Sequence, residues 1–310
     1  MSFKDTHKPK KMIHELTTDY GFDYPELLKI RATFSEFVKT AQALPSEGGE
    51  DGSCGGSVPS FYGDADSFED MVKRCYDGYS AKAISEKRYE IGAMLDYHSE
   101  SAELKHCGDE LDVPTYLSGD MRCWWADADN VNTPKRIHIV YGANCVADVN
   151  AESFINHGGA VASICDALDS MGALTKITCT FTNTAVFNGR GLQAIEIKDY
   201  SESIDIPRIG ATTHPSFFRR IGFKYFEQFC NSIGVNSEYT YGRSKTGKER
   251  GEAVSDKEFA DWLRISDDEI VVDLAAADLR VFNDTKTTAE WVAYAISKIE
   301  GSNDRHIKIF

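Results

Sequence analysis

The sequence predicts an α/β fold with a mostly parallel sheet, preceded by a helical N-terminal region. Two observations carry this prediction. Residues 136–181 run from a β-branched strand through a loop and an amphipathic helix to a second β-branched strand, which is a β-α-β unit. After that unit, strand and helix patterns alternate, at 192–197, 216–233, 269–274 and 285–300.

The helix of the first unit is expected over residues 151–171, with apolar residues at helical spacing on one face. Gly158 and Gly159 allow close packing near its start. Gly172 follows its last turn, where a residue in the left-handed conformation commonly ends a helix. The second strand is expected over residues 176–181.

One pair of strands is expected to be antiparallel. The strand at 192–197 follows 176–181 after a glycine-containing turn at 189–191, and short connections join antiparallel neighbours. Right-handed crossovers make the strand–helix–strand units parallel and lay their helices on the sheet. We therefore expect a three-layer α/β domain over residues 130–310, with one antiparallel edge.

Residues 1–129 predict a helical region beside that domain. Residues 1–24 have the pattern of a loosely attached arm, and Pro25 suits the first turn of a helix that extends to Leu44. Residues 45–60 are rich in Gly, Ser and acidic residues, which is typical of a flexible loop. Two further helices are expected at 67–77 and 80–97.

Trp124 and Trp125 follow these helices as an adjacent pair. Either both rings form a flat binding surface, or one ring packs into the core and the other covers the boundary between two domains.

Composition limits the classes of partner. The formal net charge of −15 gives no general attraction to nucleic acid. A local exception is the stretch 239–250, where aromatic and basic residues alternate. It is interpreted either as a contact for an anion or a single nucleic-acid strand, or as a solvated loop. No apolar run reaches the roughly 18 residues of a membrane helix, and the N-terminus lacks the apolar stretch of a secretory signal. We expect a cytoplasmic protein without a membrane partner.

The eight cysteines form no close pair and no C-x-x-C motif, so neither a zinc site nor a disulfide framework is expected. Cys165 and Cys179 fall within the apolar pattern of a helix and a strand, which favours small core residues.

The order of elements resembles the von Willebrand factor A-type domain, in which an antiparallel edge strand follows the first strand–helix–strand unit. This resemblance implies a divalent ion at the C-terminal ends of the strands. The family's D-x-S-x-S motif corresponds here to the stretch 141–145, YGANC, which lacks the acidic residue and both serines. The resemblance therefore implies only a degenerate site for Mg²⁺, a cation that prefers oxygen ligands, and its ligands would be Asn144, Thr212, Asp273 and Asp278.

Five sequence segments resemble an uncharacterised family found mainly in tailed bacteriophages: TFSEFVKTAQALP, SFEDMVKRCYDGYS, the block ending in ALDSMG, THPSFFRRIGFKYFE and WVAYAISKIE. The resemblance covers residues 33–300. It implies a phage-encoded protein in the host cytoplasm or the virion, and says little about mechanism.

The segment Thr212-Thr213-His214-Pro215 is the main candidate for binding. Pro215 suits a first helical turn, which would leave Thr213 or His214 as the N-cap and direct free amides outward. A helix N-terminus favours an anion, and Arg219 and Arg220 follow one turn later. The alternative is a well-capped helix whose arginines pair with surface carboxylates.

Catalytic signals are sparse. Cys145 with His157 or His214 is the one nucleophile–base arrangement suggested by the order of elements. The chain contains no G-x-S-x-G, Walker A, G-x-G-x-x-G or H-E-x-x-H motif. The leading hypothesis is a non-enzymatic protein-interaction module that uses the C-terminal ends of its strands. The alternatives are a metal-dependent hydrolase or nucleotide-handling enzyme in the same crevice, and a virion structural component.

Overall fold

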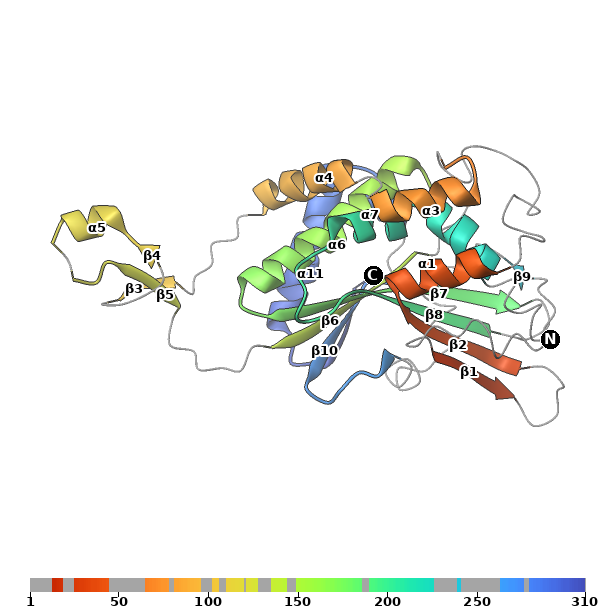
Figure 1. Ribbon diagram of the computed structural model, residues 1–310. Coiled ribbons are helices and arrows are strands. Elements are labelled where there is room, and N and C mark those ends of the chain that lie inside the picture. Colours follow the sequence, from red (N-terminus) through yellow and green to blue (C-terminus); the bar gives the residue numbers. More distant parts are fainter. Residues whose placement is uncertain are drawn as a thin grey trace.

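The polypeptide builds one large and one small β-sheet, and the labelled helices other than α5 are grouped beside the large sheet (Figure 1). These features come from a computed structural model. The residues it describes are 13–18, 25–44, 65–77, 81–95, 102–105, 110–119, 121–127, 135–143, 149–185, 190–225, 239–240, 263–275 and 279–309.

Strand β6 (Arg136–Gly142) lies at the centre of the large sheet, parallel to β7 on one side and β10 on the other. Strands β7 and β8 pair antiparallel, as the short turn between them predicts. Beyond β10, β11 extends the sheet in parallel. The predicted α/β class, with parallel central strands and an antiparallel pair, is confirmed. The remaining strands C-terminal to β6 are β7 (Leu174–Ala185), β8 (Arg190–Lys198), β9 (Tyr239–Thr240), β10 (Glu269–Asp273) and β11 (His306–Lys308).

The N-terminal segment also contributes to the large sheet. Strand β1 (Ile13–Thr18) pairs antiparallel with β2 (Pro25–Thr33), and β2 runs parallel to β8. The loose arm predicted for residues 1–24 is therefore wrong for the part that forms β1. The single helix predicted from Pro25 to Leu44 is wrong for its first half, because pairing with β8, which is remote in sequence, makes that half a strand.

Helix α1 (Phe34–Ala43) begins directly after β2, at a capping box that the sequence analysis missed. The Glu36 amide donates to the Thr33 hydroxyl at 3.4 Å, and the Thr33 amide donates to the Glu36 carboxylate at 3.3 Å. The spacing Thr-x-x-Glu before an apolar run is the sequence signal that could have located this boundary.

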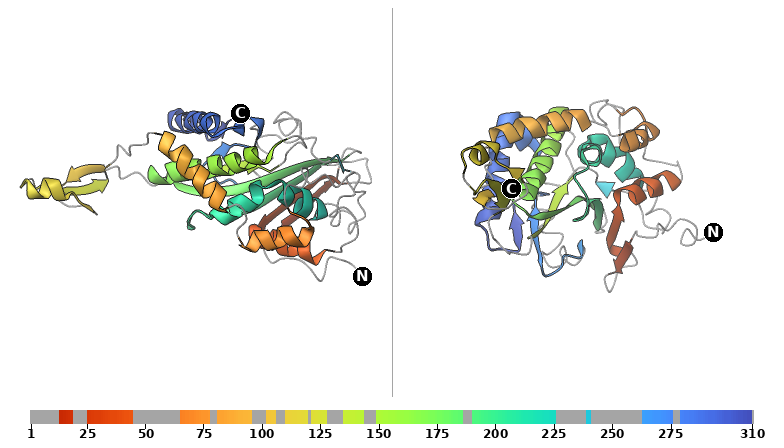
Figure 2. Two further views of the ribbon diagram at one scale, coloured as in Figure 1. Left: turned by 90° about the horizontal axis from the view of Figure 1, so that it is seen from above. Right: turned by 60° about the vertical axis from the view of Figure 1, so that its left-hand side comes forward.

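The helices form two layers on the sheet (Figures 1 and 2). Helix α6 (Ala151–Ser170) packs against the strands, and α4 (Ala81–Met94) crosses it on the side away from the sheet. The crossing is close at Gly159, where an added Cβ would lie 2.9 Å from the Cβ of Lys87. Helix α6 ends before Gly172, which has φ of +77° as predicted. Helices α3 (Phe68–Asp77) and α11 (Thr285–Gly301) complete the predicted set.

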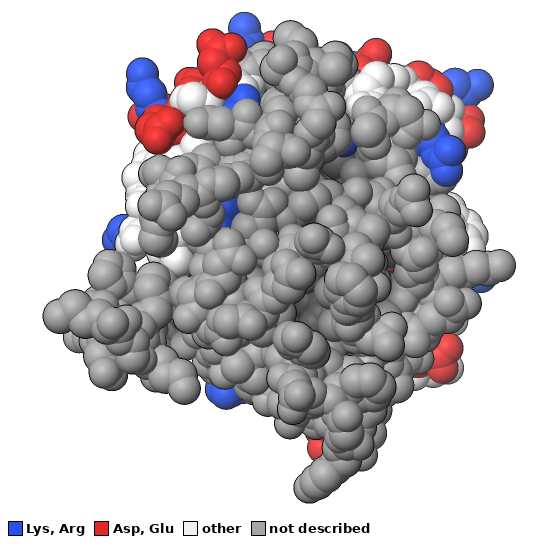
Figure 3. All heavy atoms as spheres, turned by 90° about the vertical axis from the view of Figure 1, so that its right-hand side faces the viewer, with Lys and Arg blue, Asp and Glu red and all other residues white. Residues whose placement is uncertain are grey.

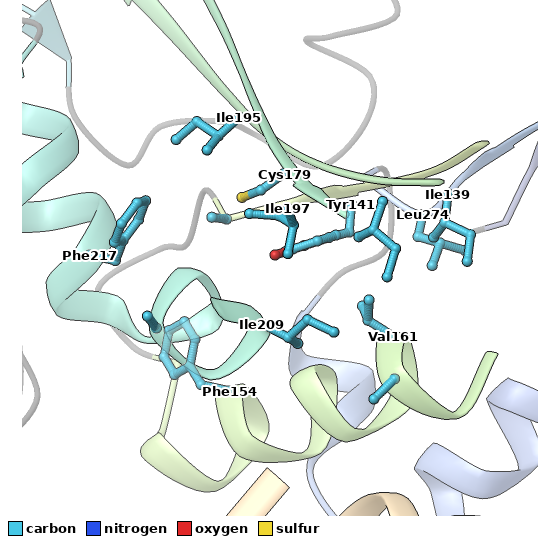
Figure 4. Packing of buried hydrophobic residues seen from close by; sticks show 14 of the residues in the cluster. Ile139, Tyr141, Phe154, Val161, Cys179, Ile195, Ile197, Ile209, Phe217 and Leu274 are labelled. Atoms are coloured by element: carbon cyan, nitrogen blue, oxygen red, sulfur yellow. The ribbon is translucent and has the colours of Figure 1, made fainter. Parts of the chain in front are cut away.

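The core lies between the sheet and these helices. Ile139 and Tyr141 of β6 point into it together with Cys179, Ile195 and Phe217 (Figure 4). All five side chains are fully buried. Burial of apolar surface is the main favourable contribution to the free energy of folding. An aromatic cluster extends this core toward α1, whose Phe37 ring stacks on Tyr225 with centroids 4.7 Å apart.

The small sheet is built from residues between α4 and β6, and Figure 1 shows it standing apart from the large sheet. Strand β5 pairs antiparallel with β3 and β4, and α5 connects β4 to β5. We call these four elements the projecting unit. They are β3 (Ala102–Lys105), β4 (Glu110–Leu111), α5 (Val113–Leu117) and β5 (Trp124–Asp127).

Candidate functional site

The segment predicted as an exposed anion-binding loop is helical and buried. Helix α7 (Ile206–Thr213) contains Thr212 and Thr213 in its last turn. The Thr212 hydroxyl donates to the Arg208 carbonyl at 2.8 Å, and the Thr213 hydroxyl donates to the Ile209 carbonyl at 2.9 Å. The predicted helix start at Pro215 is confirmed, because residues 215–225 are helical and His214 before them is extended. Thr213 does not cap that helix, and His214 Nδ1 accepts the Ser216 amide, so the prediction of a free, outward-pointing amide there is wrong.

The true N-terminus of α7 had a signal in the sequence. Asp205 caps the helix, accepting the Arg208 amide at 3.0 Å, and Pro207 occupies its first turn. An acidic cap followed by a proline marks a helix start eight residues before Thr213. The predictions from the sequence did not include α7, whereas the helix predicted from Pro215 does follow it.

Thr212 also connects α7 to the central strand. Its hydroxyl oxygen is hydrogen-bonded to the hydroxyl of Tyr141, which points from β6 into the core (Figure 4). Burial disfavours the charged phenolate and is the main reason why the pKa of Tyr141 is raised, so this phenol stays protonated. Because the Thr212 hydroxyl donates to a backbone carbonyl, we assign Tyr141 as the donor of the pair.

His214 and the two arginines lie in the interior as well. His214 caps the C-terminus of α7, and its Nδ1 accepts the Ser216 amide at 3.2 Å. The Arg220 guanidinium donates to the Ala65 carbonyl from Nε at 3.1 Å and from Nη2 at 2.8 Å. Arg219 is only 1% exposed. Arg220 thus holds the chain at the start of α3, a role different from the surface anion contact that was predicted.

Both arginines belong to η1 (Phe217–Gly222), a π-helical turn that follows α7. Its Phe217 and Phe218 rings pack against Phe181 of β7, with centroids 5.8 and 5.3 Å apart. The wider π turn departs from the α-helix predicted over 216–233, within the residues described there.

Of the predicted metal ligands, Asp273 ends β10 and is 1% exposed. Its Oδ1 accepts the Ala275 amide at 3.1 Å, and its Oδ2 lies 3.7 Å from His306 Nε2. Asn144 and Asp278 are outside the described residues. Within the described ranges, no cluster of three or more His, Cys, Asp or Glu side chains is arranged to hold a metal. The magnesium site stays a prediction.

The nucleophile–base arrangement is likewise only partly visible, because Cys145 is outside the described residues. His157 is buried between the rings of Tyr141 and Phe282, and burial lowers its pKa to about 4. Cys165 and Cys179 are buried free thiols, as predicted for core residues. Burial raises the pKa of Cys165 to about 12, so its sulfur is protonated and a poor nucleophile.

A polar group that the sequence analysis did not foresee crosses the three central strands. His138 of β6 lies between Thr178 of β7 and Glu269 of β10. Its Nε2 is 2.7 Å from the Thr178 hydroxyl oxygen, and its Nδ1 is 3.8 Å from a Glu269 carboxylate oxygen, longer than a hydrogen bond. All three side chains are buried.

The protonation states of this group follow from its surroundings. Burial lowers the pKa of His138, so the imidazole is neutral near pH 7. Burial by itself would raise the pKa of Glu269, but the contacts of its carboxylate with His138, Tyr200 and the Ser266 amide together lower it. Hydroxyl, imidazole and carboxylate in this order resemble a catalytic triad. Because Thr178 is 4% exposed in the middle of a strand, the arrangement fits strand-to-strand cohesion.

The end of the molecule toward which β7 runs is shown in Figure 3. On the described part of that face, basic and acidic side chains lie side by side at the rim, without a patch of one sign. This is the side on which the strand-end contact face was expected.

The most exposed apolar surface lies instead on the projecting unit. Val113, Tyr116 and Leu117 are 53%, 58% and 77% exposed, and Met121 in the following turn is 74% exposed. Positions i, i+3 and i+4 share one face of a helix, so the first three side chains form a single ridge. We call these four residues the α5 surface. A gathering of this kind is typical of a contact site, whereas single exposed apolar residues are ordinary.

Local hydrogen bonds hold α5 in place. Asp112 caps it by accepting the Thr115 amide at 2.8 Å, and the Asp112 amide donates to the Cys123 carbonyl at 2.7 Å. At its other end, the Ser118 hydroxyl donates to the Thr115 carbonyl at 2.7 Å. The ridge is thus presented on a preorganised turn between two paired strands. Trp124 is half-buried at the start of β5, and the side chain of Trp125 is outside the described part.

Comparison with known proteins places the chain in a family. Residues 26–278 match the model of a family described as a domain of unknown function (DUF7192). No curated protein matches the chain, and no solved structure does. None of the helices within the described residues has the length and apolar character needed to cross a membrane.

Proposed function

We propose that this chain, which belongs to the family described as a domain of unknown function (DUF7192), is a protein-interaction module that binds its partner through the α5 surface. The observation that carries this proposal is the concentration of exposed apolar side chains on the projecting unit. Tyrosine and methionine are enriched in protein–protein interfaces, and the α5 surface contains one of each.

The burial of the other candidate residues supports this choice of face. Thr212, Thr213, Arg219 and Arg220 are engaged in the core or in backbone contacts, so a partner at the strand ends would not reach them without local unfolding. The α5 surface needs no such rearrangement. The contact face therefore moves from the strand ends to the projecting unit.

Two further parts of the proposal concern origin and architecture. The strand order β8-β7-β6-β10-β11, with β8 antiparallel to β7, supports a degenerate von Willebrand A-like arrangement extended by β2 and β1. The resemblance of five sequence segments to a tailed-phage family supports a phage-encoded protein. On that basis, its partner belongs to the infected host cell or to the virion.

The test compares capture by three versions of the full-length tagged chain, read by quantitative mass spectrometry after mild cross-linking in the native host. Leu117→Asp places a charge in the ridge and should reduce the captured partner at least tenfold, because a buried unpaired charge is strongly unfavourable at an interface. Tyr89→Ser is the matched variant, since Tyr89 is 79% exposed and belongs to α4, not to the projecting unit. It should leave capture unchanged. Equal capture by Leu117→Asp and the unsubstituted chain would contradict the proposal.

A further inference from the structure

The sequence around the α5 surface is strongly acidic. Residues 102–127 contain six carboxylates, Glu103, Asp109, Glu110, Asp112, Asp120 and Asp127, against two basic side chains, Lys105 and Arg122. The formal net charge of this stretch is −4, within a chain of net charge −15. An apolar ridge is thus carried by a segment whose charged residues are mainly of one sign.

The acidic charge of this stretch discriminates among the possible binding partners of the ridge. A membrane surface with anionic lipids and a nucleic-acid backbone are both repelled by an acidic segment. A second copy of this chain would bring the same acidic stretch to the contact, and like charges facing each other across an interface are unfavourable. A protein whose binding groove has a basic rim is attracted to this acidic stretch as it approaches. The same charges also fix its orientation in the complex.

The shape of the ridge adds to this choice. Val113, Tyr116 and Leu117 share one helical face, and short helices of this kind bind by laying their apolar face in a groove. The Asp112 cap and the Ser118 hydrogen bond hold α5 in its helical form, so little conformational entropy is lost when it docks.

From these observations, and resting on the proposed function, we propose that the α5 surface inserts into an apolar groove of a partner protein whose rim carries Lys and Arg side chains. The apolar side chains supply the buried contact area. The excess of acidic residues in the same stretch of sequence selects the basic rim and excludes groove-bearing proteins with acidic rims.

The test uses a displayed library of random 16-residue peptides, selected on the immobilised full-length chain at low salt and sequenced. Selected peptides should combine aromatic or aliphatic residues with a clear excess of Lys and Arg over Asp and Glu. Their binding should weaken by about tenfold between low and high salt, because exposed charge pairs are screened. Peptides without a basic excess, or binding that is insensitive to salt, would overturn the inference.

Two variants separate this inference from the proposed function. Replacing Asp109 and Asp120 together by Lys should weaken the selected basic peptides by about tenfold while leaving the apolar ridge intact. Unchanged binding would refute the basic rim but leave the contact face standing. Leu117→Asp should abolish retention of the same peptides, and undiminished retention would refute the contact face itself. A far-ultraviolet circular dichroism spectrum like that of the unsubstituted chain shows that each variant is folded.

Discussion

The hydroxyl groups of Tyr141 and Thr212 meet in the core, where the central strand β6 faces the last turn of α7. Tyr141 donates to Thr212, and Thr212 donates onward to the Arg208 carbonyl, so the three groups form a short chain of hydrogen bonds. Both residues are fully buried, and this chain connects the centre of the sheet to a helix that covers it.

Substituting Tyr141 and substituting Thr212 should lower the free energy of unfolding by different amounts. Tyr141→Phe deletes the donor and leaves Thr212 bonded to Arg208, so the free energy of unfolding should fall by about 1 kcal/mol. Thr212→Val leaves the buried phenol with only the weakly accepting Cys179 sulfur as a partner, and should lower that free energy more, by about 1–3 kcal/mol. Urea unfolding of both single variants and the double variant would measure the difference. A double variant whose loss equals the sum of the single losses would show that the hydroxyl groups are not coupled.

The contact between α4 and α6 should be sensitive to a single methyl group at Gly159. A Cβ there would lie 2.9 Å from the Cβ of Lys87, which is close to the backbone and cannot move aside cheaply. Gly159→Ala should therefore destabilise the protein by about 1–3 kcal/mol. Gly92→Ala in α4 is the matched variant, because nothing lies within 4 Å of the added atom. It should stabilise by about 0.5–1 kcal/mol, since alanine is the better helix former. Thermal unfolding that ranks the two variants in the opposite order would contradict the packing described.

The buried histidines should make the fold sensitive to mild acid. His157 has a pKa of about 4 in the folded state, below the ordinary value near 6.5 of the unfolded chain. The unfolded state therefore binds the proton more readily, so the stabilisation is complete above pH 6.5 and is lost as the pH falls toward 4. The expected loss is about 1.4 kcal/mol per pH unit for each such histidine. His138, whose pKa is also lowered by burial, acts in the same direction.

Urea midpoints between pH 7 and pH 4.5 would measure this effect. His157→Phe keeps a ring between Tyr141 and Phe282 but cannot be protonated, so its stability should fall less steeply with acid than that of the unsubstituted chain. Parallel pH profiles for the two proteins would show that His157 is not the titrating group.

Arg220 should behave as an anchor for α3. Arg220→Met keeps the apolar stem and removes the donors to the carbonyl groups of Ala65 and Asp66. Loss of hydrogen bonds from a charged group should lower the free energy of unfolding by about 2 kcal/mol. Hydrogen exchange read by mass spectrometry should show faster exchange in α3 and little change in α11. Faster exchange of equal size in both helices would point to a global loss of stability instead.

The sequence predicts the centre of this fold better than its margins, for a physical reason. The β6-α6-β7 unit has strong local signals: β-branched strands, a helical apolar face and a glycine stop. Strand β2 has none of its own, because Leu27 and Ile30 fit a helical spacing and only pairing with β8 makes the segment extended. The two-residue strand β4 likewise depends on its partner β5.

The candidate site was misplaced for a related reason. Exposure is decided by what packs on a segment, and the sequence around Thr212 does not reveal that Tyr141 of β6 contacts it and that α6 packs on α7. The α5 surface was overlooked because Val113, Tyr116 and Leu117 resemble core residues in the sequence. Their exposure becomes visible only when the projecting unit is seen apart from the large sheet (Figure 1).

The pairing of β2 with β8 has a consequence for how the chain is made. Leu27 pairs with Arg190, so β2 leaves the ribosome roughly 160 residues before its sheet neighbour exists. At typical rates of synthesis this interval lasts on the order of ten seconds. During that time the N-terminal hairpin must wait as an unpaired edge, which is open to wrong pairing. Completion of the large sheet is therefore tied to the late part of translation rather than to the order in which the strands emerge.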